Sequence, residues 1–392
     1  MINSVVVRPT NLRLWIVSLA LIAVTLVPYF GSRLLADTHT PAPLHVKIIH
    51  GMQPTYSVEA GIDGDVFPAI ANYESLLRSD DRDFGTFTVT ISNPSETALK
   101  AHISLEVPGW SDLELQNVTV GSGEVRKLLF APVFQPRLYE NHEITAATAV
   151  MDVTDSLGRP IHRETIPVRL RSVDDMYWGR DFRYAPFIAS WVTPHDPQVE
   201  AILSRAKEFM PGRRVPGYEE WKSAADQRAM TTAEARAIYR AVQEMGVSYV
   251  KSSITFGRNT DVSERVRMPE ESLDERSANC IDGVVLYASL FENLGMDPVV
   301  ILVPGHAYVG VRDAQDSKSF LYLETAVTGR APFETAVKAA TRRISRLPEN
   351  SVIRILVSDA RTAGIYPMPL PDRTPRPEPV ADVSAEAPPA GR

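Results

Sequence analysis

Three residues in the second half of the chain could together form a nucleophilic site. Cys280, the only cysteine of the chain, is followed by an apolar stretch, then by His306 and then by Glu324. A thiol can attack an acyl carbon, an imidazole can carry its proton, and a carboxylate can orient the imidazole. The order therefore indicates a candidate thiol-nucleophile site. A buried structural cysteine is the alternative interpretation.

The residues after Cys280 predict a buried helix that begins at the cysteine. Apolar side chains leave few polar faces between Ile281 and Leu294, and Gly295 is typical of a helix end. A thiol at a helix N-terminus lies at the positive end of the helix dipole, which favours the thiolate. The N–H groups of the same helix end could hold an oxyanion.

Two strands after this helix should bring the histidine and the glutamate together. With the hairpin centred on Gln315, Gly310 pairs with Phe320, and His306 pairs with Glu324. The alternation then turns four aliphatic residues toward the core, namely Val309, Val311, Leu321 and Leu323. The pattern that buries the aliphatic residues thus predicts His306 directly opposite Glu324.

Length and charge limit the classes of function. At 392 residues the chain is long enough for two hydrophobic cores. The net charge of -7 does not favour nucleic acid as a partner, because phosphate binding needs clustered Lys and Arg. One cysteine excludes an intrachain disulfide. No nucleotide, flavin or metal motif is recognisable, so we expect no cofactor.

The N-terminal segment 1–36 predicts an anchor in the membrane. Residues 14–30 form a stretch of seventeen residues without a charge, near the minimum that spans a bilayer. Arg8 and Arg13 precede it, which favours a cytoplasmic N-terminus. A signal peptide cleaved after Ala36 is the alternative, although Leu34 stands where a small residue is expected. In a Gram-negative host, we expect a single-pass inner-membrane protein whose bulk is periplasmic.

Residues 40–172 have the pattern of an immunoglobulin-like β-sandwich. About seven short alternating runs are separated by turn signals such as Asn93-Pro94. Three histidines fall in this part, and no pair of them has the spacing of metal ligands. They are predicted to be surface or edge residues: His102, His142 and His162.

Helix signals dominate after residue 172. Asp196 before Pro197 predicts an N-cap, and Thr231 with Glu234 predicts a capping box for a second helix through Met245. The last segment, 367–392, is rich in Pro, Ala and charge and is predicted to be a disordered tail.

The segment Tyr239–Thr325 resembles the core of the transglutaminase-like (papain-like) superfamily. The shared features are a helix leading to Tyr249-Val250, a cysteine at a helix start with Asp282 two residues later, a Gly-His dipeptide, and an acid on the next strand. The resemblance covers about a quarter of the chain well and residues 175–366 loosely. It implies Cys280 as nucleophile, His306 as general base and Glu324 as orienting acid.

With this resemblance, the expected architecture is multi-domain. One transmembrane helix precedes the all-β immunoglobulin-like sandwich, which is followed by an α+β transglutaminase-like domain at residues 173–366. We expect a cysteine hydrolase or transamidase that acts on amide bonds of a peptide or protein, with the lipid bilayer contacting residues 14–30. The alternative is a catalytically inactive scaffold or binding protein of the cell envelope.

Overall fold

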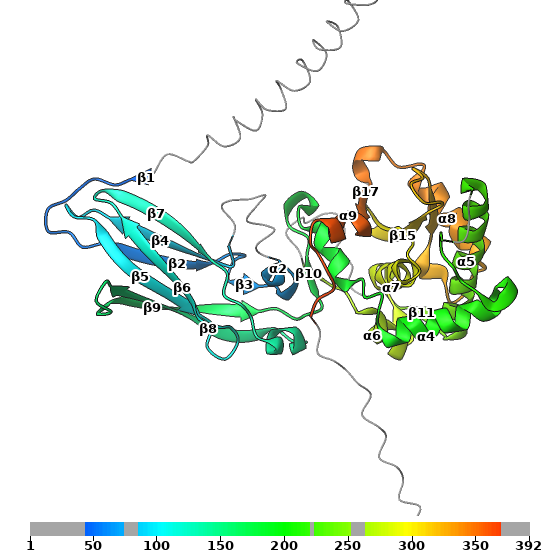
Figure 1. The fold of residues 1–392 in the computed structure, drawn as a ribbon, viewed down its shortest axis with the longest axis horizontal. Coiled ribbons are helices and arrows are strands. Elements are labelled where there is room, and N and C mark those ends of the chain that lie inside the picture. The colour runs from blue at the N-terminus through cyan, green and yellow to red at the C-terminus, as the bar shows by residue number, and fades with distance from the viewer. Residues whose placement is uncertain (1–43, 74–84, 220–222, 252–262, 370–392) are drawn as a thin grey trace, which may run out of the picture. The chain divides into compact units, whose positions relative to one another are not determined.

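The computed structural model describes residues 44–73, 85–219, 223–251 and 263–369 (Figure 1). These residues divide into two compact units, of which the first holds 44–56, 90–100 and 119–127 and the second holds all the others. The predicted anchor and nearly all of the predicted tail lie outside the described residues. Within them, no helix combines the length and the apolar character that a membrane crossing requires.

Strands from Leu44 to Leu170 form two sheets (Figure 1). The four-stranded sheet has the order β1-β7-β4-β2, with β1 (Leu44–His45), β2 (Thr55–Ala60), β4 (Phe87–Asn93) and β7 (Glu124–Phe130). The five-stranded sheet has the order β3-β9-β8-β5-β6, with β3 (Asp65–Val66), β5 (Leu99–Glu106), β6 (Glu114–Val120), β8 (Thr145–Asp155) and β9 (Pro160–Leu170). The two sheets contain nine strands, more than the seven or so alternating runs predicted, because β1 and β3 have only two residues each. The immunoglobulin-like assignment stays a prediction.

In the first unit, one buried amide fixes the turns. The side chain of Asn93 donates to the carbonyl groups of Thr97, Val120 and Gly121 at 2.9, 3.0 and 2.9 Å. Gly123, whose φ is +71°, donates its N–H to the Asn93 carbonyl at 2.8 Å. A fully buried asparagine is thus satisfied by backbone groups, as a buried polar side chain must be.

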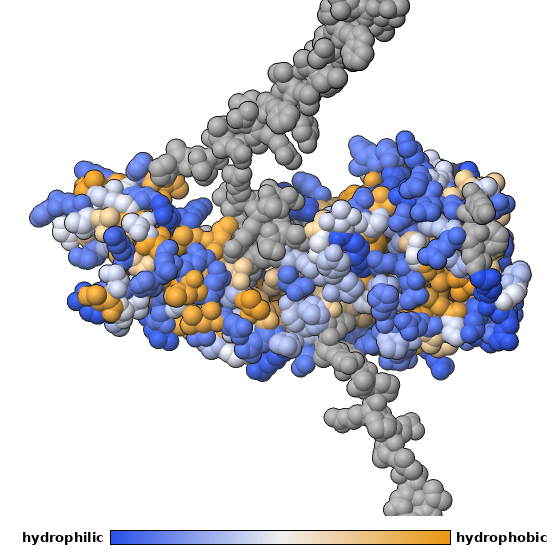
Figure 2. Space-filling view, in the orientation of Figure 1, coloured by the Kyte–Doolittle hydropathy of each residue, from blue (hydrophilic) through white to orange (hydrophobic). Residues whose placement is uncertain are grey.

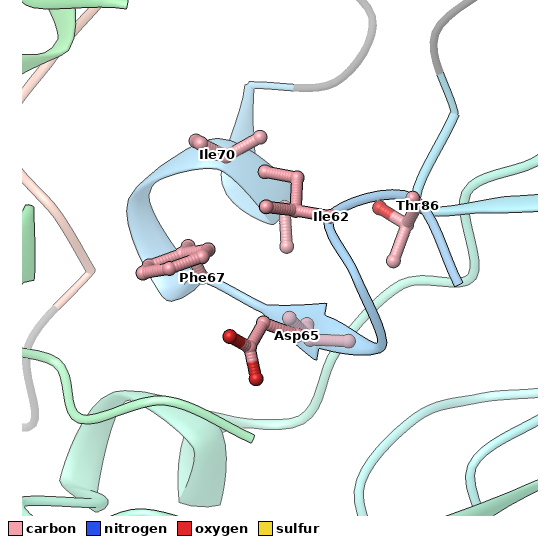
Figure 3. A pocket seen from close by; sticks show the side chains of 8 residues that line it. Ile62, Asp65, Phe67, Ile70 and Thr86 are labelled. Atoms are coloured by element: carbon pink, nitrogen blue, oxygen red, sulfur yellow. The ribbon is translucent and has the colours of Figure 1, made fainter. Parts of the chain in front are cut away.

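In the second unit, a short helix contributes to a large core. Residues in and next to this helix, α2 (Pro68–Asn72), join a core whose other members lie between Val173 and Met368; they include Phe67, Ile70 and Tyr73. The Tyr73 hydroxyl donates to the Tyr366 carbonyl. A cavity of about 10 Å³, with room for about one water molecule, lies beside α2 (Figure 3). It is lined in part by Ile62, Asp65, Phe67, Ile70 and Thr86 (Figure 3).

The remaining elements of the second unit are helices around a four-stranded sheet (Figure 1). The helices are α4 (Pro197–Ala206), α5 (Ala224–Glu244), α6 (Pro269–Asp274), α7 (Cys280–Asn293), α8 (Phe333–Ile344) and α9 (Val357–Thr362). The sheet has the order β16-β15-β14-β17, with β14 (Pro298–Val303), β15 (His306–Arg312), β16 (Phe320–Leu323) and β17 (Ile353–Leu356). Two short pairs complete this part: β10 (Asp175–Tyr177) with β12 (Ser263–Arg265), and β11 (Ser248–Tyr249) with β13 (Ser277–Ala278).

Short 3₁₀ turns connect many of these elements in both parts of the chain. They are η1 (Pro136–Glu140), η2 (Arg180–Phe182), η3 (Ala185–Trp191), η4 (Lys207–Phe209), η5 (Pro211–Arg213), η6 (Thr325–Val327) and η7 (Glu349–Ser351). The predicted boundaries between the domains stay predictions.

Of the two helix caps predicted from the sequence, the structure confirms one and contradicts the other. The Asp196 cap of α4 is confirmed, because its carboxylate accepts from the N–H of Gln198 at 2.8 Å. The capping box of Thr231 and Glu234 is wrong. Helix α5 begins eight residues earlier, and Ser223 is its N-cap. The intervening residues, including Ala224 and Ala225, are good helix formers and extend the helix backward.

The sheet is covered on both faces, which makes its strands apolar on both sides. Val300, Leu302 and Val309 belong to the large core that includes helix α7. Val299, Ile301 and Tyr308 belong to a smaller core with Ala340 and Ile344 of α8. Alternate residues of a strand point to opposite faces, so β14 and β15 supply both cores. Strand β14, buried at all six positions, therefore reads as a continuous apolar run.

Hydrophobic side chains also reach the surface of the strand-rich part, which is residues 44–170 (Figure 2). Leu113, Leu115 and Val133 are among its most exposed apolar residues. Single exposed apolar residues are normal on soluble domains, and these need no functional explanation.

The buried carboxyl of Glu234 yields a prediction about stability. Burial raises the pKa of Glu234 to about 7. Among the described residues, only its Oε1 accepts a hydrogen bond, from the N–H of Gly217 at 3.0 Å. A raised folded-state pKa makes the parent lose stability as pH rises from about 4.5 through 7. Glu234→Gln should gain about 3 kcal/mol relative to the parent between pH 4.5 and 8, measured by urea unfolding.

The exposed Glu200 on α4 provides the control for this experiment. Glu200→Gln should show the same difference from the parent at both pH values. A pH-independent difference for Glu234→Gln would mean that the Glu234 carboxyl is not held protonated by the fold.

Candidate functional site

The N-terminus of α7 positions Cys280. The side chain of Asn279 accepts from the Asp282 N–H at 2.9 Å, and the Asp282 carboxylate accepts from the Asn279 N–H at 2.9 Å. This reciprocal capping box satisfies two N–H groups that a helix start otherwise leaves without partners. Cys280 is therefore the first helical residue, as the sequence predicted.

Asp282 also ties the helix start to the segment before α6. Its fully buried carboxylate accepts from the N–H of Arg267 at 2.9 Å and from the Arg267 guanidinium at 3.0 Å. Burial raises the pKa of Asp282, and these donors act in the opposite direction. Asp282 thus holds the first turn of α7 in place, because removing any of these donors would leave a buried charge poorly satisfied.

His306 and Glu324 are bonded to each other at the ends of β15 and β16. The ring nitrogen Nε2 of His306 donates to Glu324, at 2.8 Å from Oε2 and 3.0 Å from Oε1. The Tyr308 ring lies edge-on to the imidazole with 4.7 Å between ring centres. Glu324 is itself the N-cap of η6, because Oε1 accepts from the Ala326 N–H at 3.0 Å. The imidazole is therefore oriented by the carboxylate and the neighbouring ring.

The register that was predicted for this hairpin is wrong by two residues. Gly310 pairs with Tyr322 and Arg312 with Phe320, so the hairpin is centred on Asp316. Seven residues, Asp313 to Ser319, connect the two strands, and the centre of the turn lies one residue further along the chain than predicted. An even shift keeps every side chain on its predicted face. His306 consequently meets Glu324 diagonally, and diagonal neighbours remain within reach of long side chains.

Backbone contacts bring Cys280 beside this pair. The Thr325 hydroxyl donates to the Cys280 carbonyl at 3.3 Å, and the Ala307 backbone forms a hydrogen bond with the thiol. Thr325 follows Glu324 in the chain, and Ala307 follows His306. A Cβ added to Gly283 would lie 2.8 Å from the Thr325 hydroxyl oxygen, so only glycine allows this approach of α7. The three predicted residues are thus in one neighbourhood.

The protonation state of the Cys280 thiol differs from the prediction. Cys280 is fully buried, and burial together with the charge of Glu264 raises its pKa to about 12. The expected thiolate is therefore wrong for this conformation, because desolvation outweighs the helix dipole. Among the described residues, no hydrogen bond joins the Cys280 thiol to the His306 ring.

Glu264 is a component of this neighbourhood that the sequence did not indicate. It lies on β12, is 2% exposed, and accepts from the Trp178 indole N–H at 3.3 Å. Its second oxygen has no hydrogen-bond partner among the described residues. Burial raises the pKa of Glu264 to about 8. Three residues of strand give no periodic signal, so only tertiary structure identifies this carboxyl.

The three histidines of the strand-rich part are partly exposed, as predicted, but one has acidic neighbours. Nδ1 of His142 lies 3.4 Å from Asp174 and 3.9 Å from Glu271. His102 bonds to Asn117, and Nε2 of His162 lies 3.5 Å from Glu164. The sequence missed the first group because its members come from three separate segments.

Comparison with known proteins adds no assignment: neither a family model nor a curated protein matches this chain.

The electrostatic coupling of Glu264 to the thiol yields a prediction. Because the Glu264 carboxyl ionises near pH 8, its charge opposes the thiolate mainly above that pH. Glu264→Gln should therefore raise the iodoacetamide alkylation rate of Cys280 roughly 3- to 10-fold at pH 9.5, since one pKa unit changes the thiolate fraction tenfold. The two rates should converge below pH 7.

Glu234→Gln is the matched control, because it removes another buried carboxyl that does not act on Cys280. Equal alkylation rates in the parent and in Glu264→Gln at pH 9.5 would refute the coupling. Cys280 is the only cysteine, so all alkylation reports on this thiol.

Proposed function

We propose that the chain is a cysteine-dependent acyl-transfer enzyme that acts on amide bonds, with Cys280 as nucleophile, His306 as general base and Glu324 as the orienting acid. The proposal rests on a pair of contacts that bring the cysteine next to His306 and Glu324. His306 and Glu324 bond to each other, and the residue after each one bonds to Cys280. The resemblance of residues 239–325 to the transglutaminase-like superfamily supports the same assignment.

In the first step the thiol proton must move to the imidazole. Nε2 of His306 is engaged by Glu324, which leaves Nδ1 to accept the proton from the Cys280 sulfur. With a pKa of about 12, roughly one thiol in 10⁵ is ionised at pH 7. The resting site is therefore not a preformed thiolate, and the reaction depends on the base. Substrate entry must also expose the sulfur, which is fully buried.

The second step forms and then breaks bonds at the amide carbon. The sulfur bonds to the carbonyl carbon, and the C–N bond breaks as the amine leaves with the proton from His306 Nδ1. The cap of α7 does not use the N–H groups of Cys280 and Ile281, which could stabilise the oxyanion. Water or a second amine then attacks the thioester and restores the thiol. Water gives a peptidase or amidase, and a lysine-type amine gives a transamidase.

The predicted anchor at residues 14–30 suggests the substrates. An enzyme held in the inner membrane with its bulk in the periplasm would meet envelope proteins and peptides. We therefore propose a peptide or protein substrate, and neither nucleic acid nor a cofactor has a role in this mechanism.

A second candidate function is a catalytically inactive scaffold or binding protein of the envelope. The specific observation in its favour is the thiol itself. Cys280 is fully buried, its pKa is raised to about 12, and it makes no hydrogen bond to His306 among the described residues. A buried cysteine of this kind is an ordinary core residue.

Alkylation at neutral pH separates these two functions. In an enzyme, iodoacetamide should label Cys280 of the folded full-length chain at pH 7.5 faster than global unfolding allows. His306→Ala should slow labelling about tenfold or more, because it removes the only proposed proton acceptor. Glu324→Gln should slow labelling less, because the imidazole remains. Intact-mass spectrometry over time measures each rate.

His195→Ala serves as the control, since it removes an exposed imidazole from the same part of the chain. If labelling follows the global unfolding rate and is equal in the parent and His306→Ala, Cys280 is a core residue and the scaffold function is supported.

A further inference from the structure

A second group of side chains shares no residue with Cys280, His306 and Glu324. His142 precedes β8, Asp174 precedes β10, and Glu271 lies on α6. One ligand atom from each of these three residues lies within 4.8 Å of the other two. All three belong to the second compact unit. Segments that are distant in the sequence thus present one imidazole and two carboxylates at a single point.

The separations within this group are longer than those of charge-assisted hydrogen bonds. Nδ1 of His142 is 3.4 Å from Asp174 Oδ2 and 3.9 Å from Glu271 Oε1. By contrast, His306 is 2.8 Å from Glu324, in the usual range for a direct bond. Two ligands about 2.1 Å from a zinc ion at the tetrahedral angle are about 3.4 Å apart. The group therefore has the spacing of ligands around a common ion.

The carboxylate of Asp174 supplies an independent observation. Asp174 is fully buried, and Oδ1 has no hydrogen-bond partner among the described residues. The other oxygen, Oδ2, faces His142 and also accepts from the Ser172 hydroxyl at 3.4 Å. A buried carboxylate oxygen without a partner is costly, and a cation bound to this carboxylate would reduce that cost.

Hydrogen bonds to backbone groups position the two residues that carry the carboxylates. Glu271 Oε2 accepts from the N–H of Met268 at 3.1 Å, and Oε1 lies 3.9 Å from Nδ1 of His142. The Asp174 carbonyl accepts from the N–H of Val266 at 2.8 Å. Such outer contacts orient ligands before the ion arrives.

One neighbouring cation opposes metal binding. The guanidinium of Arg265 lies 3.3 Å from Asp174 Oδ2, and its side chain is 60% exposed. With a metal bound, the exposed Arg265 side chain can turn toward solvent, but its charge still lowers the affinity.

We propose that His142, Asp174 and Glu271 bind one divalent transition-metal ion, with Zn²⁺ as the best fit. Imidazole nitrogen favours transition metals, whereas Mg²⁺ and Ca²⁺ prefer oxygen alone. Three protein ligands leave a fourth position for water in a tetrahedral site. The ion would link the segment before β8, the segment before β10 and helix α6.

Titration calorimetry of the metal-free full-length chain with ZnCl₂ at pH 7.5 tests this site. The parent should bind Zn²⁺ more tightly than MgCl₂, and both His142→Ala and Glu271→Gln should weaken the tightest Zn²⁺ site at least tenfold. The glutamine keeps an oxygen for the α6 cap, so it provides a second variant if His142→Ala does not fold. Arg265→Gln should tighten Zn²⁺ binding about threefold or more, which a purely structural ion pair does not predict.

His162→Ala is the matched control, because it removes another histidine that lies near a carboxylate. Its Zn²⁺ affinity should equal that of the parent. Unchanged Zn²⁺ binding in both His142→Ala and Glu271→Gln would overturn the proposal. A loss in His162→Ala as large as in His142→Ala would overturn it as well, because binding would then be non-specific.

Discussion

The buried carboxylate of Asp282 is the interaction on which the candidate site depends. It accepts hydrogen bonds from two backbone N–H groups and one guanidinium, and its own N–H is capped by Asn279. A charge that is removed from water needs such compensation, and each donor is worth more where the surroundings are dry. The first turn of α7 can therefore adopt only one arrangement, with Cys280 turned inward beside β15.

The same burial that fixes the cysteine also suppresses its ionisation. The positive end of the helix dipole contributes about 0.3–1 kcal/mol at exposed sites, whereas full burial of an ionised group costs several kcal/mol. The nearby charge of Glu264 adds to the burial effect. His306, at 23% side-chain exposure, is far more accessible than the thiol. The burial that holds the start of α7 in one arrangement therefore also makes the Cys280 thiol less reactive.

Local signals predicted two helix starts correctly, although a third, the capping box of Thr231 and Glu234, was wrong. The start of α7 at Cys280 and the Asp196 cap of α4 follow from side chains that act within one turn. Strand alternation placed His306 and Glu324 on one face, but the length of the turn, which sets the register, has no periodic signal. The thiol's protonation, Glu264 and the His142 group depend on tertiary neighbours. No reading of the sequence alone contains the distances or the desolvation that decide them.

The absence of a side chain at Gly283 has a consequence for the whole neighbourhood. Helix α7 rests on Thr325 at a distance that even one methyl group would increase. Because Thr325 follows Glu324 and also holds the Cys280 carbonyl, this contact fixes how far the cysteine lies from the imidazole–carboxylate pair. The distance between the Cys280 thiol and the His306 imidazole, across which a proton would pass, therefore depends on the missing Cβ of Gly283 and not on the reactive groups themselves.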